Sequence, residues 1–196
     1  IDMGDDGSAI THYSEAPAIP ILKEAYDKGI EVAVANIKLN DASFICGGFT
    51  SQDLLNGQKL GDYTAKYLSD KYGNDLKIAI MDFDAAIPEQ SKARYGVVQV
   101  IMNMGLSDKI TVVGYDMGEQ TATQLLDENS PLYCTLEQDM YTMGYKAVEQ
   151  LVKTLRGEET ECPRGDTVYL EGIIHSKEDL AGVQTWLDGY YKLANS

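Results

Sequence analysis

The sequence predicts an α/β protein with mostly parallel sheets, because buried strand patterns alternate with helical patterns along the chain. Residues 30–35 and 110–113 are short apolar runs, typical of strands that are buried on both faces. Residues 140–156 carry apolar side chains at helical spacing. No low-complexity linker divides the sequence, so two lobes would have to be interleaved rather than sequential.

Local signals predict the other elements. Further strands are expected at residues 9–12, 43–47, 77–81, 132–136 and 167–174, and further helices at residues 14–28, 53–72 and 90–104. Ser176, with Asp179 three residues later, resembles a capping box for a last helix. Asp53 is a plausible N-cap of the helix at 53–72. The inner face of that helix is expected to carry Leu54, Gly57, Gly61, Ala65, Leu68 and Tyr72.

Composition argues against several classes of function. The net charge of −15 disfavours nucleic acid or an anionic membrane as a partner, because both need clustered Lys and Arg. No run of about 18 apolar residues is present, so no membrane-spanning helix is expected. The hydrophobic content of 44% is ordinary for a globular domain.

The usual catalytic and cofactor motifs are missing from the sequence. Cys46, Cys134 and Cys162 match no short zinc pattern and are interpreted as core thiols or unpaired cysteines. His12 and His175 are far apart in sequence, which gives little support to a histidine metal site or a Ser-His-Asp triad. The glycine-rich nucleotide-binding motifs G-x-G-x-x-G and G-x-x-x-x-G-K-[ST] do not occur. The nucleophile-elbow motif G-x-S-x-G of α/β-hydrolases does not occur either. We therefore expect no enzyme activity, no cofactor and no metal.

Polar side chains follow successive strands at the points where those strands end. Asn36, Asp116 and Gln138 occupy such positions, and Arg94 lies near the start of the helix after residue 81. In open α/β sheets ligands bind at the carboxyl ends of the strands. Amide, guanidinium and carboxylate groups suit the hydroxyls of a small polyol, which donate and accept hydrogen bonds. Each residue alone is more often a helix cap or a turn, so the hypothesis rests on the set.

Five segments resemble, in order, motifs of the type I periplasmic solute-binding proteins, the ribose- and galactose-binding group. They are AIPILKEAYDKGIEVAVA at 18–35, QDLLNGQKLGDYTAK at 52–66, SKAR at 91–94, ITVVGYD at 110–116 and QDMYTMGYKAVE at 138–149. The resemblance covers about residues 9–175. It departs from the family at the start, where the first strand and helix are missing, and after Arg94, where a strand–helix–strand unit is missing.

The resemblance implies two interleaved three-layer α/β/α lobes with mostly parallel sheets, three crossings between the lobes and a sugar bound between them. Some elements of the family's lobes would be missing. The expected lobes are residues 1–74 with 140–166, and residues 75–139 with 167–196. By the same likeness Asn36, Arg94, Asp116 and Gln138 fall on ligand-contacting positions, as does Thr11. Tyr13 and Tyr115 lie beside them and could stack on a sugar, or pack in the core or rim.

The function implied is an extracytoplasmic protein that binds a sugar or related polyol and delivers it to an ABC importer. Its partners would be the sugar and the membrane subunits of the permease, with no nucleic acid and no membrane insertion of its own. The location would be the periplasm, or the cell surface as a lipoprotein. The alternatives are the ligand-sensing domain of a lac-repressor-type regulator, a receptor ectodomain and an α/β enzyme.

Overall fold

A computed structural model describes residues 4–73 and 110–195, and these residues divide into two compact units. Unit 1 comprises residues 4–53 and 138–172, and unit 2 comprises residues 54–73, 110–137 and 173–195. Three crossings therefore connect the two units. The predicted α/β class with interleaved parts is confirmed. The expected strand at 77–81, the expected helix at 90–104 and Arg94 lie outside the described residues.

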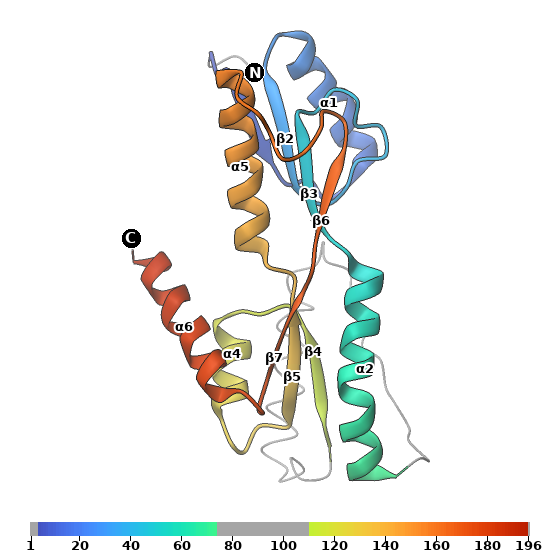
Figure 1. Cartoon of the computed structure of the whole chain (residues 1–196), viewed down its shortest axis with the longest axis vertical. Coiled ribbons are helices and arrows are strands. Elements are labelled where there is room, and N and C mark those ends of the chain that lie inside the picture. The colour runs from blue at the N-terminus through green and yellow to red at the C-terminus, as the bar shows by residue number, and fades with distance from the viewer. Residues whose placement is uncertain (1–3, 74–109, 196) are drawn as a thin grey trace. The chain divides into compact units, whose positions relative to one another are not determined.

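Unit 1 is built on a four-stranded parallel sheet (Figure 1). Its strands, in spatial order, are β1 (Gly7–Ile10), β2 (Glu31–Asn36), β3 (Gly47–Ser51) and β6 (Thr167–Leu170). Because all four run in the same direction, their carboxyl ends meet at one edge of the sheet. This edge, called here the unit 1 edge, carries several of the predicted ligand residues.

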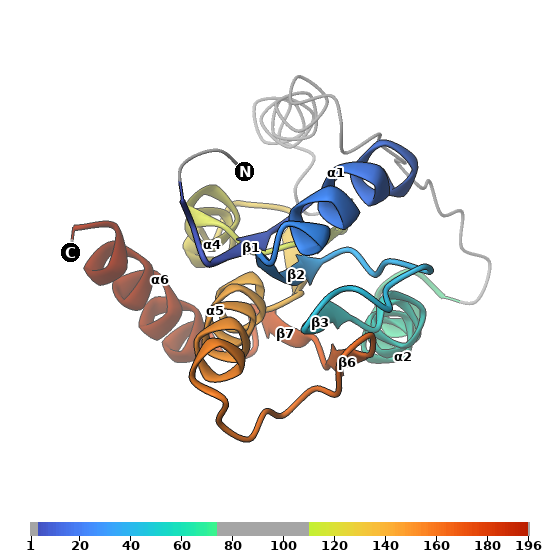
Figure 2. The same cartoon turned by 90° about the horizontal axis from the view of Figure 1, so that it is seen from above.

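Helices cover both faces of this sheet because the side chains of β2 alternate between two cores. The valines of β2 pack in a cluster with α1 (Glu15–Asp27), whereas its alanines pack in a second cluster with α5 (Met140–Arg156). Figure 2 shows the two helices on opposite sides of β2. A strand buried on both faces is the arrangement expected of a parallel sheet.

A buried side chain of α5 hydrogen-bonds the backbone of two other segments of unit 1. Gln150 is only 2% exposed, and its Nε2 donates to the carbonyl oxygens of Cys46 and Cys162, both at 2.7 Å. Its Oε1 accepts from the amide of Cys162 at 3.2 Å. A Cβ on Gly47 would lie 2.9 Å from Gln150 Nε2, so the glycine leaves the room that this amide needs.

Unit 2 has a three-stranded sheet in the order β4 (Val112–Tyr115), β5 (Leu132–Glu137) and β7 (Ile173–Ser176). β5 runs parallel to β4 and antiparallel to β7. A core of buried apolar residues joins the start of β5 to α4 (Glu119–Leu126) and α6 (Leu180–Ala194).

The helix α2 (Asp53–Tyr72) packs on β5 of unit 2 through tyrosine rings. The ring of Tyr67 stacks on that of Tyr133 with 3.7 Å between the centroids. Glu178 accepts from the hydroxyls of Tyr133 at 2.5 Å and Tyr63 at 3.0 Å, and these bonds lower its pKa. The cluster therefore joins α2, β5 and the turn before α6.

Several sequence expectations differ from the structure. The expected strand at 167–174 is wrong, because β6 and β7 are separate strands in different sheets and the chain crosses between units at residues 172 and 173. Residues 54–72 lie in unit 2 and β6 lies in unit 1, which differs from the expected lobe bounds. The expected inner face of α2 is also wrong, since Leu54 is 77% exposed while Asn56 and Thr64 are buried.

All three thiols are free and buried, and we expect them to resist alkylation in the folded protein. Burial raises the pKa of each thiol, and that of Cys134 reaches about 12. Since only the thiolate is nucleophilic, iodoacetamide at neutral pH should modify none of the three until urea unfolds the chain. Intact mass measurement checks this, and rapid modification of a cysteine in the native protein would contradict it.

Candidate functional site

Hydrogen bonds run in a row across the unit 1 edge. The hydroxyl of Thr11, just after β1, donates to the carbonyl of Ala35 at 3.1 Å. The hydroxyl of Thr50, at the end of β3, donates to the carbonyl of Asn36. Asn36 and Thr50 are paired in the β-ladder register, so the ends of β2 and β3 are held side by side. The backbone at this edge is thus fixed by side chains from neighbouring strand ends.

Gln138 extends the row to the start of α5. Its Nε2 donates to Ser51 Oγ at 3.0 Å and to Asp53 Oδ1 at 2.8 Å, and the Ser51 hydroxyl also donates to Asp53. Asp139 then caps α5 by accepting from the amide of Thr142 at 3.1 Å. The predicted residues Thr11, Asn36 and Gln138 therefore lie on one edge of unit 1.

Asp116 occupies the corresponding position in unit 2, directly after β4. Its backbone amide donates to the carbonyl of Leu136 at 2.7 Å, and its carbonyl accepts from the hydroxyl of Thr135 at 2.8 Å. A Cβ on Gly114 would lie 2.8 Å from Thr135 Oγ1, so glycine gives that hydroxyl its space. The backbone of Asp116 is held on both sides while the residue itself is exposed.

Backbone conformation marks the same strand ends. Among the described residues, the non-glycine residues with positive φ are Asn36 at 75°, Asp116 at 74° and Asp139 at 54°. Two of these are predicted ligand residues, and the third follows Gln138. Left-handed conformations of non-glycine residues cost free energy and collect at ligand sites, where the surrounding structure enforces them. Asn and Asp tolerate this conformation best, which suits the residue types found here.

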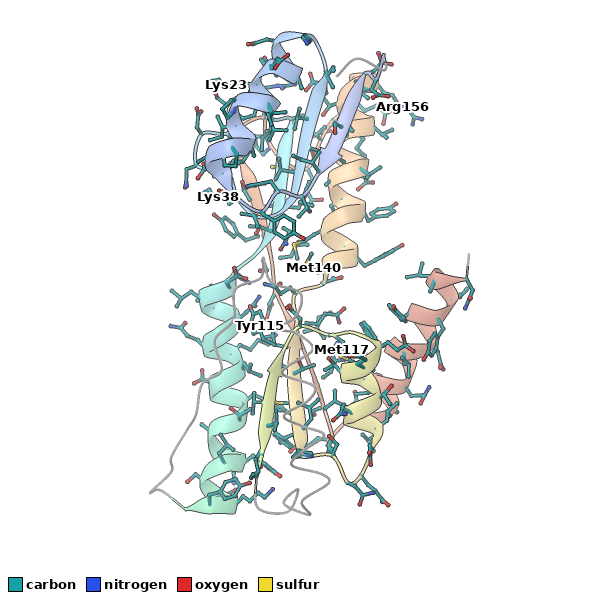
Figure 3. The ribbon with its side chains drawn as sticks, turned by 180° about the vertical axis from the view of Figure 1, so that it is seen from behind. Lys23, Lys38, Tyr115, Met117, Met140 and Arg156 are labelled. Atoms are coloured by element: carbon teal, nitrogen blue, oxygen red, sulfur yellow. The ribbon has the colours of Figure 1, made fainter. Side chains whose placement is uncertain are left out.

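The other predicted residues are the tyrosines Tyr13 and Tyr115. Tyr13 follows Thr11 and is 82% exposed. Tyr115 ends β4 beside Asp116 and is partly buried; Figure 3 labels it with Met117 at this end of the strand. The structure thus groups Thr11, Asn36 and Gln138 in unit 1, with Tyr13 nearby in sequence, and Tyr115 and Asp116 in unit 2.

Glu137 is a strand-end residue whose contacts the sequence reasoning did not predict. It ends β5, and its carboxylate accepts from His175 Nε2 and from Trp186 Nε1 at 2.7 and 2.8 Å. The side chains of Glu137 and His175 are 14% and 11% exposed. The signal available was its place at a strand end immediately before Gln138. Its partners come from β7 and α6, which sequence spacing does not connect to it.

Ser51, Asp53 and His12 also lie at the unit 1 edge without having been predicted there. Asp53 was expected only as a helix cap, and in the structure its carboxylate is also the acceptor for Gln138. His12 follows Thr11 and is 6% exposed. Burial lowers the pKa of its imidazole, against the smaller opposing effect of Glu15, so the neutral form is favoured.

Within residues 4–73 and 110–195, no group of three or more His, Cys, Asp or Glu side chains is arranged to hold a metal ion. Over the same part of the chain, no helix combines the length and apolar character needed to cross a membrane. The groups available at the unit 1 edge and at the end of β4 are amide, carboxylate, hydroxyl and imidazole groups. All of them can form hydrogen bonds with hydroxyl groups of a ligand.

Solved structures resemble the chain over most of its length, although no family model matches its sequence and no curated protein matches it significantly. One is the periplasmic binding protein component of the arabinose ABC transporter from Shewanella sp. ANA-3, bound to α- and β-L-arabinofuranose. It has a TM-score of 0.74 and 20% identity, covering 98% of this chain and 80% of that chain.

Two further structures illustrate the range of ligands among these proteins. An ABC transporter solute-binding protein from Bacillus halodurans with bound myo-inositol has a TM-score of 0.69 and 14% identity, covering 93% of this chain and 77% of that one. A 5-methylthioribose transporter solute-binding protein from Thermotoga lettingae has a TM-score of 0.66 and 20% identity, covering 90% and 69%. The chain therefore has the fold of the type I periplasmic solute-binding proteins.

Proposed function

We propose that the protein binds a small sugar or related polyol outside the cytoplasm and delivers it to the membrane subunits of an ABC importer. It performs no chemistry on the ligand. The ligand residues in this proposal are Thr11, Asn36 and Gln138 on the unit 1 edge and Asp116 in unit 2, with Tyr13 and Tyr115 beside them and Arg94 from the predicted set.

The observation that carries the proposal is the chemistry at the strand ends. Carboxyl ends of parallel strands are where open α/β sheets bind ligands, and here they present Asn36 and Asp116 in enforced left-handed conformations. Amide and carboxylate groups held in fixed directions discriminate among polyols by the geometry of their hydroxyls. The charge of −15 also disfavours the regulator alternative, whose DNA partner needs a basic surface.

The solved structures of the same fold support the ligand class. The three structures described above hold L-arabinofuranose, myo-inositol and 5-methylthioribose, and a fourth of the same fold, from Agrobacterium vitis, holds allitol. These compounds range from an open-chain alditol to five- and six-membered rings, and all are small and rich in hydroxyls. They define a panel of compounds to test, because identity near 20% or lower does not transfer a particular ligand to this chain.

Thermal unfolding with this panel tests the proposal. A ligand at about 100 times its Kd stabilises the folded state by about 2.7 kcal/mol, which raises the Tm by roughly 5–10 °C for a chain of this size. L-arabinose, D-ribose, D-galactose, myo-inositol, allitol and 5-methylthioribose are the candidates, with ATP and NAD as negative controls. Stabilisation by none of the sugars or polyols, confirmed by calorimetry, would exclude the proposal for this ligand class.

A further inference from the structure

His12 has an environment that a purely structural histidine rarely has. It is 94% buried, yet neither Nδ1 nor Nε2 has a hydrogen-bond partner in the part of the chain that the structure describes. Buried polar groups in folded proteins are nearly always hydrogen-bonded, because an unsatisfied group loses its water without compensation. An imidazole without a partner among the described residues is therefore a candidate for hydrogen bonding to a bound ligand.

The groups around His12 are already engaged with other partners. The neighbouring hydroxyl of Thr11 donates to the carbonyl of Ala35. The carboxylate of Glu15, which acts on His12 electrostatically, accepts from the amide and the side chain of Asn40 at 2.5 and 2.7 Å. Neither residue supplies His12 with a hydrogen bond. The imidazole is left with one donor and one acceptor at the end of β1, on the unit 1 edge.

We propose that the imidazole of His12 hydrogen-bonds hydroxyl groups of the bound sugar or polyol, accepting through one ring nitrogen and donating through the other. A hydroxyl group both donates and accepts, so a neutral imidazole complements a pair of neighbouring hydroxyls. This inference rests on the proposed function and adds a ligand contact that the strand-end pattern does not predict. It also gives a reason for a polar ring at a buried position, where an apolar side chain would leave no nitrogen without a hydrogen bond.

Replacing His12 by leucine separates a binding role from a structural role. His12→Leu keeps an apolar side chain of similar size and removes the two orphaned nitrogens, so the ligand-free variant should melt about 2–4 °C higher than the parent. Its affinity for L-arabinose or myo-inositol, whichever the parent binds, should fall about tenfold to a hundredfold. His12→Gln, which restores a donor and an acceptor, should recover part of the lost affinity.

The outcomes are distinct. Unchanged affinity in His12→Leu would overturn this inference and leave the proposed function intact. A lower Tm of ligand-free His12→Leu would also overturn it, because it would mean that the imidazole has a partner within the chain. If the parent protein binds no compound of the panel, the proposed function fails, and this inference fails with it.

Imidazole ¹⁵N NMR gives a second readout that mutation does not complicate. Only two histidines are present, so the His12 signals are identified by their loss in His12→Leu. Adding L-arabinose or myo-inositol to the parent should shift the ring ¹⁵N signals of His12, since both nitrogens gain hydrogen-bond partners. Binding without any shift in these signals would contradict the contact.

Discussion

Asp116→Asn should weaken sugar binding about tenfold to 150-fold while leaving the fold and its stability nearly unchanged. A hydrogen bond to a charged group contributes about 1.5–3 kcal/mol, and the amide removes the charge while keeping the shape. The left-handed backbone at φ 74° is accepted by Asn as well as by Asp, so the substitution adds no strain. Isothermal calorimetry with a sugar of the panel measures the change.

A surface carboxylate in the same unit supplies the control. Asp62 lies exposed on α2, and Asp62→Asn changes the net charge by the same amount. Its affinity should equal that of the parent. Asp116→Ala, by contrast, should also lose stability, because alanine tolerates the left-handed conformation poorly, at a cost of about 1–2 kcal/mol. Equal affinity in Asp116→Asn and Asp62→Asn would remove Asp116 from the ligand contacts.

Gln150→Leu should destabilise unit 1 by about 2–6 kcal/mol, a large share of the 5–15 kcal/mol typical of a domain. Leucine fills a similar volume but leaves the carbonyl groups of Cys46 and Cys162 and the amide of Cys162 without their bonds to Gln150. The carbonyl of Cys162 keeps the hydroxyl of Thr160 at 3.3 Å, and each of the other two groups costs about 1–3 kcal/mol when left unsatisfied. Urea unfolding followed by circular dichroism measures the loss.

Gln120→Leu is the matched control, since Gln120 is exposed on α4 and its replacement should change stability by no more than about 0.5 kcal/mol. Gln150→Glu should be as damaging as Gln150→Leu, because a carboxylate would face the two carbonyl oxygens that now accept from the amide. If Gln150→Leu unfolded at the same urea concentration as Gln120→Leu, the hydrogen bonds of Gln150 would have no energetic importance.

Elements with strong periodicity were predictable from the sequence, and elements defined by pairing were not. Helix α5 was expected at residues 140–156, which are its observed bounds. The third strand was expected at 43–47 but lies at Gly47–Ser51, because its position is set by pairing with β2. Helix α2 turns an unexpected face inward because Tyr63 and Tyr67 stack on Tyr133 of β5. The pattern of apolar residues within α2 does not predict this contact.

The place of the predicted ligand residues at strand ends could be expected from the sequence, whereas their hydrogen bonds could not. Strand ends identified Asn36 and Asp116 because parallel strands place their carboxyl ends at one edge. The positive φ angles of these residues follow from tertiary hydrogen bonds that no local pattern encodes. The isolation of His12 is likewise a property of its neighbours, since it depends on Glu15 being engaged by Asn40.

The bond from Trp186 to Glu137 gives this protein an internal fluorophore. Trp186 is the only tryptophan in the chain, and its indole lies in unit 2, against the carboxylate that ends β5 and near the imidazole of His175. Its emission therefore originates from one unit alone. A variant that melts only the other unit would lose ellipticity while the tryptophan spectrum stayed native, so the two signals together report on the independence of the two halves.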